Sequence, residues 1–286
     1  FGVALEGALF NRANFSLEYF DKRSQDLLFD VYLPLSAGAT STSDAEATIT
    51  QNLGSVSNRG LEFIFDVDVV KSEDWRWNVG LNFTKLKNKI VTLPEQNREN
   101  GIVSGTKKYM EGHGIYDFWM YQYVGVDQMT GRSLYSPDFE KYYAGEAVEG
   151  KTAIPAEHVV QIGADYYTTN TTYSRKDWSG SAIPDLFGSA STSLSYKNFD
   201  LSVLLTYSLG GKTLDYSYQS LMSVSATPHS LHSDLLNAWD GVPAGMTENS
   251  PNRIDPNAVP GLNYGYSTYS DATSSRFLLD ASYLVV

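Results

Sequence analysis

The sequence of 286 residues contains no cysteine, which excludes a disulfide scaffold and thiolate chemistry. No stretch approaches the roughly 18 to 20 consecutive apolar residues of a membrane-spanning helix, so only strands could cross a bilayer. Basic residues are scarce, with 21 Lys and Arg against 33 Asp and Glu, and the net charge of −12 argues against a nucleic-acid partner. The mean hydropathy of −0.27 is compatible with a β-barrel, because a barrel encloses its polar side chains.

Two alternating segments joined by two residues give the clearest structural signal. In residues 199–209, one face is apolar and the other, apart from Leu204, is polar: Phe199, Leu201, Val203, Leu205, Tyr207 and Leu209 against Asp200, Ser202, Thr206 and Ser208. Residues 189–196 alternate in the same way, and Lys197-Asn198 predicts a tight hairpin turn between the two segments. A strand of this length with one apolar side is typical of a tilted strand that crosses a bilayer.

Two further hairpins are predicted from the same pattern. One joins residues 61–69 to 75–83 through a polar turn at 71–74, and the other joins residues 1–10 to 15–29 through 11–14. The connections at about 31–56, 94–116 and 211–273 are long, and a short helix is predicted over 231–239. We expect about eight spanning strands in all. Short turns that alternate with long loops are typical of outer-membrane barrels.

Five segments, taken in chain order, resemble the barrel portion of the SusC/RagA-type TonB-dependent transporters. They are residues 58–62 (NRGLE), 77–84 (WNVGLNFT) with 88–91 (NKIV), 123–127 (YVGVD) with 130–131 (TG), 183–211, and 274–284. The resemblance implies an all-β fold, in which this chain is an antiparallel segment of a transmembrane β-barrel with long outer loops. Barrels of this plugged kind have about 22 strands.

The resemblance also implies a function. SusC-like proteins import oligosaccharides, or peptides in the RagA branch, across the bacterial outer membrane. A SusD-like lipoprotein acts as their lid, and TonB delivers energy through the plug domain. We expect residues 1–286 to form part of such a barrel, in contact with outer-membrane lipid, with the plug domain and the final strands absent from this chain. The start at Phe1, without a Met or a signal segment, predicts a mature or truncated chain.

Other groups could carry chemistry, but a structural interpretation is favoured for each. They are His229 and His232 with Asp234, at a spacing that suits metal ligands, and the acidic pairs Asp66/Asp68 and Asp138/Glu140, at a spacing that suits a glycosidase. The histidines lie in a polar segment without a third ligand fixed by the sequence. The carboxylates are better explained as solvated wall or loop residues. We therefore expect no enzyme activity, no catalytic residue, no metal site and no cofactor.

An aromatic cluster is the candidate substrate site. Tyr116, Phe118, Trp119, Tyr121 and Tyr123 lie within eight consecutive residues. Aromatic faces commonly stack on sugar rings, so these side chains could line a glycan path. Trp and Tyr also form girdles at membrane interfaces, and girdle or loop packing is the favoured interpretation.

Two other protein classes show many alternating strands. A small stand-alone outer-membrane barrel of about eight strands would serve as an anchor or adhesin. A soluble carbohydrate-binding β-sandwich would bury its apolar faces against each other and would need no detergent. Extraction behaviour separates the sandwich from the barrels, and the length of the parent reading frame separates the transporter from the small barrel.

Overall fold

The structure is a computed structural model that describes residues 1–32, 48–224, 230–262 and 273–286. Antiparallel strands dominate it, and the chain divides into two compact units. The first unit consists of Phe1–Phe118, Gly180–Thr213 and Asp280–Val286, and the second of Trp119–Ser179 and Leu214–Leu279. Among the described residues, no helix is both long and apolar enough to cross a membrane.

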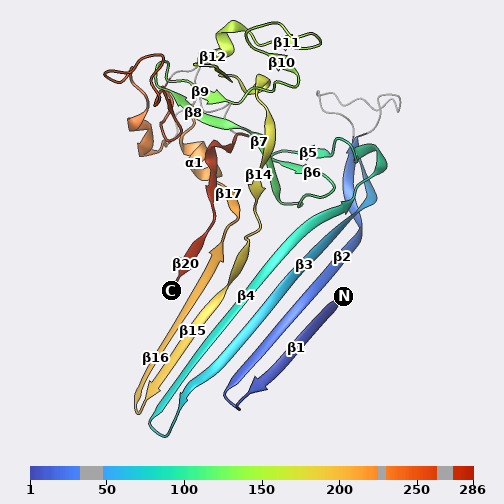
Figure 1. Cartoon of the computed structure of the whole chain (residues 1–286), viewed down its shortest axis with the longest axis vertical. Coiled ribbons are helices and arrows are strands. Elements are labelled where there is room, and N and C mark those ends of the chain that lie inside the picture. The colour runs from blue at the N-terminus through green and yellow to red at the C-terminus, as the bar shows by residue number, and fades with distance from the viewer. Residues whose placement is uncertain (33–47, 225–229, 263–272) are drawn as a thin grey trace. The chain divides into compact units, whose positions relative to one another are not determined.

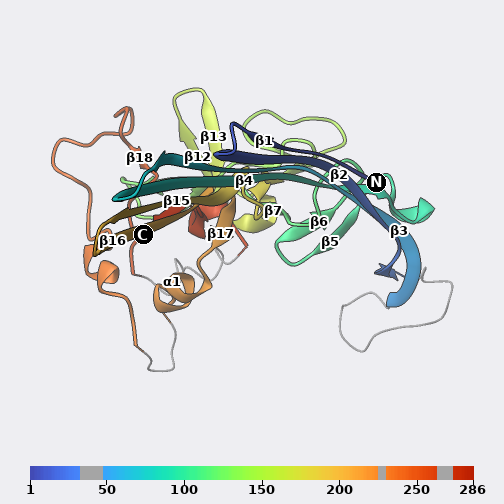
Figure 2. The same ribbon diagram turned by 90° about the horizontal axis from the view of Figure 1, so that it is seen from below.

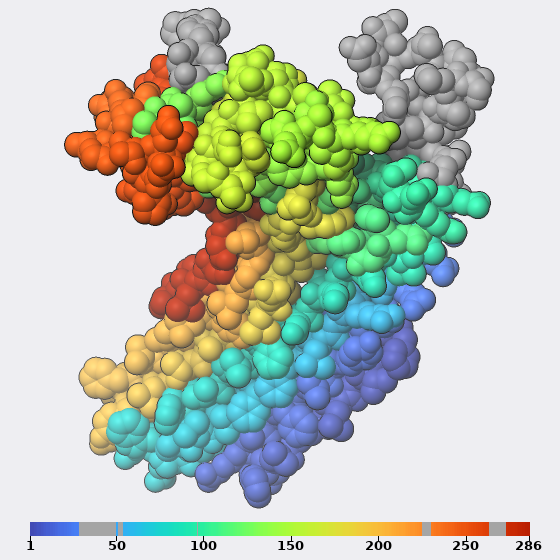
Figure 3. Space-filling view, turned by 45° about the horizontal axis from the view of Figure 1, so that its top comes forward, coloured from blue at the N-terminus to red at the C-terminus, as the bar shows by residue number. Residues whose placement is uncertain are grey.

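A sheet of seven antiparallel strands forms most of the first unit (Figure 1). In spatial order these are β1 (Gly2–Leu9), β2 (Ala13–Tyr32), β3 (Thr48–Lys71), β4 (Trp75–Thr92), β15 (Leu186–Tyr196), β16 (Phe199–Leu209) and β20 (Tyr283–Val285). Seen from below, the long strands form a single curved layer (Figure 2), and their side chains lie as adjacent stripes of one surface (Figure 3). The predicted all-β, antiparallel fold is confirmed, with seven strands in this sheet where about eight were expected.

Three tight turns close the hairpins at the lower end of the sheet in Figure 1. They comprise residues 10–12, 72–74 and 197–198, so all three predicted hairpins are confirmed. Phe10, Asn11 and Lys197 have φ values of 54°, 51° and 52°. These left-handed conformations let the chain reverse within two or three residues.

The predicted bounds of the long connections were partly wrong. The loop placed at 31–56 is shorter, because β2 continues to Tyr32 and β3 begins at Thr48; residues 33–47 lie outside the described part. Residues 94–116 are not one loop, since they contain the strands β5 (Ile102–Ser104) and β6 (Lys107–Tyr109) after the short helix η2 (Glu95–Asn97). Elements of three residues are too short to show a periodicity, so they could not be predicted from the sequence.

The connection placed at 211–273 also contains regular structure. Its elements are β17 (Lys212–Leu214), α1 (Tyr216–Leu221), η5 (Ser233–Asn237) and β18 (Ile254–Asp255), followed by η8 (Ser275–Phe277) and β19 (Leu278–Asp280). The helix predicted over 231–239 is present as η5, a single 3-10 segment. The nitrogen Nδ1 of His232 caps it by accepting a 3.1 Å hydrogen bond from the backbone N–H of Asp234.

Short strands make up the second unit. Its main sheet has the order β12 (Val159–Ile162), β13 (Asp165–Thr168), β9 (Ser133–Tyr135), β8 (Tyr123–Asp127) and β18. A two-stranded parallel pair, β10 (Tyr142–Tyr143) and β11 (Thr152–Ala153), and the helices η3 (Ala156–His158) and η4 (Thr171–Tyr173) complete it. The strands β7 (Asp117–Tyr121) and β14 (Lys176–Ser181) run across the boundaries of the two units.

Each unit has its own buried apolar residues. In the first, Val56 and Ile90 at the ends of β3 and β4 pack with Leu93 and Ile102. In the second, Val126, Leu134 and Tyr135 have no exposed surface. The long sheet contributes little to either cluster, and many of its apolar side chains, such as Leu5, Leu201 and Leu284, are exposed.

Candidate functional site

The first feature of the site is a continuous apolar face on the seven-stranded sheet. Strand register places one row of side chains across all seven strands: Leu5, Leu17, Phe63, Phe83, Gly188, Tyr207 and Leu284. The neighbouring row contains Gly7, Phe15, Phe65, Leu81, Ala190 and Leu205. This face is exposed, with Leu5 at 62% and Leu284 at 68% of their full accessible surface. A β-sandwich would bury such a face.

Polar atoms on the apolar face are satisfied within the sheet. The indole N–H of Trp77 donates to the hydroxyl of Thr192 at 2.9 Å. The hydroxyl of Tyr207 reaches across Gly188 and donates to the carbonyl of Asn82 at 3.0 Å. Gly188 permits this approach, because a side chain there would meet the backbone of β4. A surface in contact with hydrocarbon requires such internal pairing.

The opposite face of the same strands is polar. One of its rows contains Glu6, Ser16, Ile64, Asn82, Ser189, Thr206 and Val285, in which Ile64 and Val285 are the large apolar side chains. On the same face, the side-chain amide of Asn78 on β4 donates to the carboxylates of Asp66 and Asp68 on β3, at 3.1 and 3.2 Å. Strand register thus confirms the predicted separation of the two faces. The acidic pair Asp66/Asp68 serves as an acceptor for this amide on the wall.

Aromatic side chains gather on the apolar side near the tight turns. The rings of Trp75 and Tyr196 stack with centroids 4.1 Å apart. Phe199 and Phe10 are 77% and 91% exposed. Exposed aromatic rings at the end of an apolar band are the pattern of a membrane-interface girdle.

The predicted aromatic substrate cluster is divided between the two units. Tyr116 and Phe118 belong to the first unit, and Trp119, Tyr121 and Tyr123 to the second. Phe118 is buried, and the ammonium of Lys107 lies 3.4 Å from the centre of its ring. Tyr116 is half exposed.

The three cluster residues of the second unit contact other side chains of that unit. The ring of Trp119 meets that of Trp178 edge-on at 5.0 Å, and the ammonium of Lys176 lies 4.6 Å from the ring of Tyr121. Tyr123 packs edge-on against Tyr135 at 5.9 Å. Packing therefore occupies part of each ring, in line with the structural interpretation favoured for the cluster.

A buried ion pair organises the second unit, and sequence reasoning missed it. Asp127, at the end of β8, has no exposed surface and receives two hydrogen bonds from Arg253, at 2.8 and 3.1 Å. The backbone N–H of Met129 and the hydroxyl of Thr130 also donate to its carboxylate, at 3.1 and 2.9 Å. Burial would raise the pKa of Asp127, but the hydrogen bonds and the charge of Arg253 outweigh it, so the pKa lies below its ordinary value. Arg253 is 126 residues away, and no local pattern could have indicated the pair.

The described carboxylates Asp234 and Asp138, from the metal and glycosidase candidates, accept hydrogen bonds from neighbouring groups. His229 lies outside the described residues, and within the described part no group of three or more potential metal ligands is present. Asp234 accepts a 2.8 Å hydrogen bond from the hydroxyl of Tyr218, which helps to raise the pKa of Tyr218, together with burial, to about 12. Asp138 caps a turn by accepting from the backbone N–H of Glu140 at 3.1 Å.

Comparison with known proteins gives a consistent result. No model of a known protein family matches the sequence. The chain is 28% identical over 250 residues to TonB-dependent receptor P3 of Formosa agariphila, which is 83% of this chain and 22% of the receptor. It is 22% identical over 280 residues to TonB-dependent receptor SusC of Bacteroides thetaiotaomicron, which is 97% of this chain and 24% of SusC. The chain thus spans about a quarter or less of the length of these relatives.

The fold also matches a solved structure. The RagAB peptide transporter aligns with a TM-score of 0.68 and 22% sequence identity, over 99% of this chain and 27% of that one. The same architecture in its closed-closed and open-open states aligns with TM-scores of 0.64 and 0.62. The resemblance seen in the sequence is therefore confirmed: the chain is similar in sequence to TonB-dependent receptors, SusC among them, and it has the fold of part of a TonB-dependent β-barrel transporter.

Proposed function

We propose that this chain supplies barrel wall and outer loops to a TonB-dependent importer in the bacterial outer membrane. The single observation that carries the proposal is the register of the seven-stranded sheet, which separates an exposed apolar face from a mostly polar face on the six strands from β1 to β16. Lipid would cover the apolar face, and the polar face would line an aqueous lumen. The similarity to TonB-dependent receptors supports the same role.

The two edges of the sheet support the proposal that residues 1–286 form part of a larger barrel. Among the strands that the structure describes, β1 pairs with β2 alone and β20 with β16 alone. Unpaired edges are not stable within hydrocarbon, so further strands must complete the wall. A barrel wide enough to hold a plug has about 22 strands. The plug domain that contacts TonB would likewise be supplied outside this chain.

The substrate in this proposal is an oligosaccharide or a peptide, with a SusD-like lipoprotein as the lid. The RagAB relative is a peptide transporter, and SusC is a TonB-dependent receptor. Of the aromatic cluster, Tyr116 is half exposed, Trp119, Tyr121 and Tyr123 are partly exposed, and Phe118 is buried. Stacking on these rings is the proposed contact with substrate.

Uptake by the full-length transporter tests the function. Cells that express it should accumulate a labelled oligosaccharide or peptide pool, and the uptake should disappear without TonB or after the proton gradient is collapsed. Uptake that persists without TonB would overturn the proposal. Folded, monomeric protein in buffer without detergent would overturn the assignment of the apolar face to lipid.

A separate variant tests the aromatic contact. Trp119→Ala in the full-length transporter should reduce uptake of one substrate class at a normal protein level, because stacking of a substrate group on one aromatic ring contributes on the order of 1 kcal/mol. Trp178→Ala is the matched control, because it removes the packing partner of Trp119 and leaves the ring itself. Equal defects in the two variants would show that the contact is structural.

A further inference from the structure

A row of lysines continues the apolar face beyond its aromatic end. On β4 the side chains of that face are Val79, Leu81 and Phe83, and the next positions on the same side are Lys85, Lys87 and Lys89. All three lysines are exposed, whereas the alternate residues Asn88 and Ile90 are 9% and 0% exposed. Because side chains alternate along a strand, the lysines extend from the face that carries the apolar rows.

The packing of the opposite side fixes this direction. Ile90 packs against Leu93 and Ile102, and the side-chain oxygen of Asn88 accepts a 2.8 Å hydrogen bond from the backbone N–H of Ile115. Chain from the 93–115 segment therefore covers the polar side of β4 at this level. The lysines lie on the other side, away from the proposed lumen.

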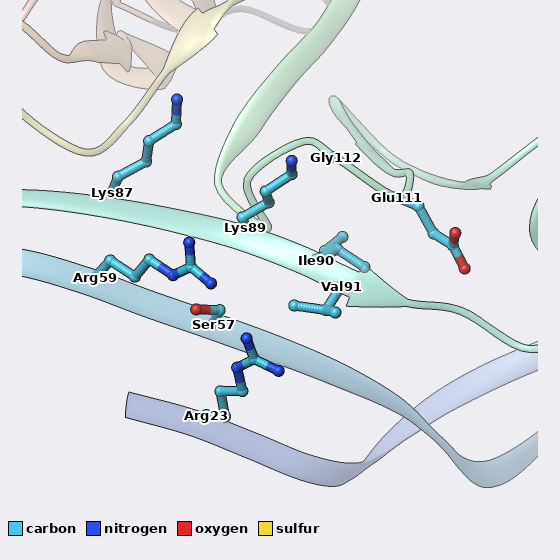
Figure 4. A pocket seen from close by; sticks show the side chains of 9 residues that line it. All are labelled: Arg23, Ser57, Arg59, Lys87, Lys89, Ile90, Val91, Glu111 and Gly112. Carbon is cyan, nitrogen blue, oxygen red and sulfur yellow. The ribbon is translucent and has the colours of Figure 1, made fainter. Parts of the chain in front are cut away.

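Neighbouring strands add two arginines to the row. Strand register aligns Arg59 with Lys87, and Ser57 with Lys89. Arg23 is aligned with Ser57, so β2, β3 and β4 each contribute a cation to the same face. We call Arg23, Arg59, Lys85, Lys87 and Lys89 the basic band. Figure 4 shows four of its members around a hollow of about 560 Å³.

The acidic groups near the basic band are outnumbered. Asp21 binds Arg59 at 2.9 Å and accepts a 2.9 Å hydrogen bond from the hydroxyl of Ser57, which fixes the guanidinium in place. Glu111, at the edge of the hollow, is paired with Arg98 at 3.2 Å. Within the described part of the chain, Lys85, Lys87 and Lys89 take part in no ion pair. The band is thus a local excess of positive charge on a chain of net charge −12.

We propose that the basic band binds the phosphate groups of a phosphorylated lipid in the outer leaflet of the membrane. The proposal rests on the function proposed above, since it requires lipid on the apolar face. The tight turns mark the periplasmic end of such a barrel, so the basic band lies toward the outer leaflet. Acyl chains would cover Phe63 and Phe83, and Lys85 follows one row above them, aligned with Leu61 and about 7 Å along the strand.

Continuity with the apolar face selects a lipid over a soluble anion. A soluble phosphate would need only the charges, whereas a lipid uses the charges and the adjoining apolar rows together. Lysine and arginine side chains at an interface extend their charged ends toward headgroups, and an arginine can hold a phosphate with two hydrogen bonds. The geometry therefore fits a headgroup that carries more than one phosphate, spread over three strands.

Lipid A, a glycolipid with two phosphates, is the probe for the test. Full-length transporter in mild detergent is mixed with lipid A, and the bound lipid is measured by native mass spectrometry. The variant Lys87→Gln/Lys89→Gln should bind roughly 10- to 30-fold more weakly, because each lysine near an anionic surface contributes a factor of about five. Lys71→Gln/Lys197→Gln removes the same charge at the tight-turn end and should bind as the parent protein does.

Three outcomes would overturn the proposal. They are equal binding by Lys87→Gln/Lys89→Gln, equal binding of lipid A from which both phosphates were removed, and full competition by inorganic phosphate, which would indicate a soluble anion. Substrate uptake separates this failure from failure of the proposed function. If only the lipid site is wrong, the parent transporter still imports substrate in a TonB-dependent way.

Discussion

The seven-stranded sheet and the second compact unit satisfy their polar groups in opposite ways. In the sheet, polar side chains gather on one face and bond across strands, as Asn78 does to Asp66 and Asp68. In the second unit, charge is buried at the centre, where Asp127 and Arg253 form a pair with 0% and 10% side-chain exposure. The sheet distributes its stabilisation over many equivalent positions, whereas the second unit concentrates it in a few.

This difference predicts different responses to substitution. In the sheet, the effect of a change depends on which face it lies on, because the two faces meet different surroundings. In the second unit, the effect depends on a specific partner, because an unpaired buried charge is costly. Four changes test the comparison, from the largest expected effect to the smallest.

Arg253→Met should have the largest effect. It leaves the carboxylate of Asp127 buried without its cation, and breaking a buried pair in this way costs about 3 to 5 kcal/mol. Hydrogen exchange in the full-length transporter should show faster exchange throughout 123–135. Arg175→Met removes an exposed ion pair of the same unit, with Asp177 at 3.2 Å, and should change little. Equal exchange in both variants would contradict the central role of the buried pair.

Charge on the apolar face should come next. Val203→Arg and Leu205→Arg place a cation among the apolar rows and should each destabilise the barrel by about 2 to 4 kcal/mol. Ser202→Arg lies next to Val203 in the sequence but on the polar face, and it should be tolerated. The folded fraction is measured by the mobility of unheated and heated protein in gel electrophoresis. If all three variants fold equally well, the two faces do not meet different surroundings.

Gly188→Ala should have an intermediate effect within the sheet. A methyl group there meets the backbone of Asn82 and Phe83 and displaces the ring of Tyr207, for a cost of about 1 to 3 kcal/mol. The midpoint of thermal unfolding in detergent reports the change. Gly241→Ala is the control, because a methyl group at Gly241 meets no described atom within 4 Å. An unchanged midpoint for Gly188→Ala would show that the strands can separate at this point.

Acid should have the smallest effect, and in the second unit this effect can be traced to Asp127. The folded-state pKa of Asp127 lies below its ordinary value of 3.8, so its contribution to stability is present above that value and lost as the pH falls through the folded pKa. Exchange of residues 123–135 should therefore accelerate below about pH 4. In Asp127→Asn this part of the pH dependence should disappear. The same pH dependence in both proteins would assign it to other carboxylates.

The hairpins could be predicted from the local sequence pattern. In β16, alternation of apolar and polar residues was enough to predict the strand, its turn at Lys197 and the two faces, since the side-chain period of a strand is two. The 94–116 segment was not predictable in the same way, because β5 and β6 have three residues each. Elements this short form only when tertiary contacts hold them.

The candidate sites, too, could be predicted from the sequence only in part. The aromatic cluster at 116–123 was visible in the sequence, but its division between the two units was not. The alternation of Lys85, Lys87 and Lys89 with apolar or buried residues was also present as a local pattern. The alignment of these lysines with Arg59 and Arg23 depends on strand register, which cannot be read from the sequence of one strand.

The sequence by itself determined the strand type, the tight turns and the sorting of side chains onto two faces, because these depend on neighbours a few residues apart. Only the tertiary structure decided which rows align across the sheet and which distant groups meet. The pairing of Asp127 with Arg253 joins residues 126 positions apart, and the basic band joins three strands. Such contacts join residues that are far apart in the sequence, so a local periodicity cannot predict them.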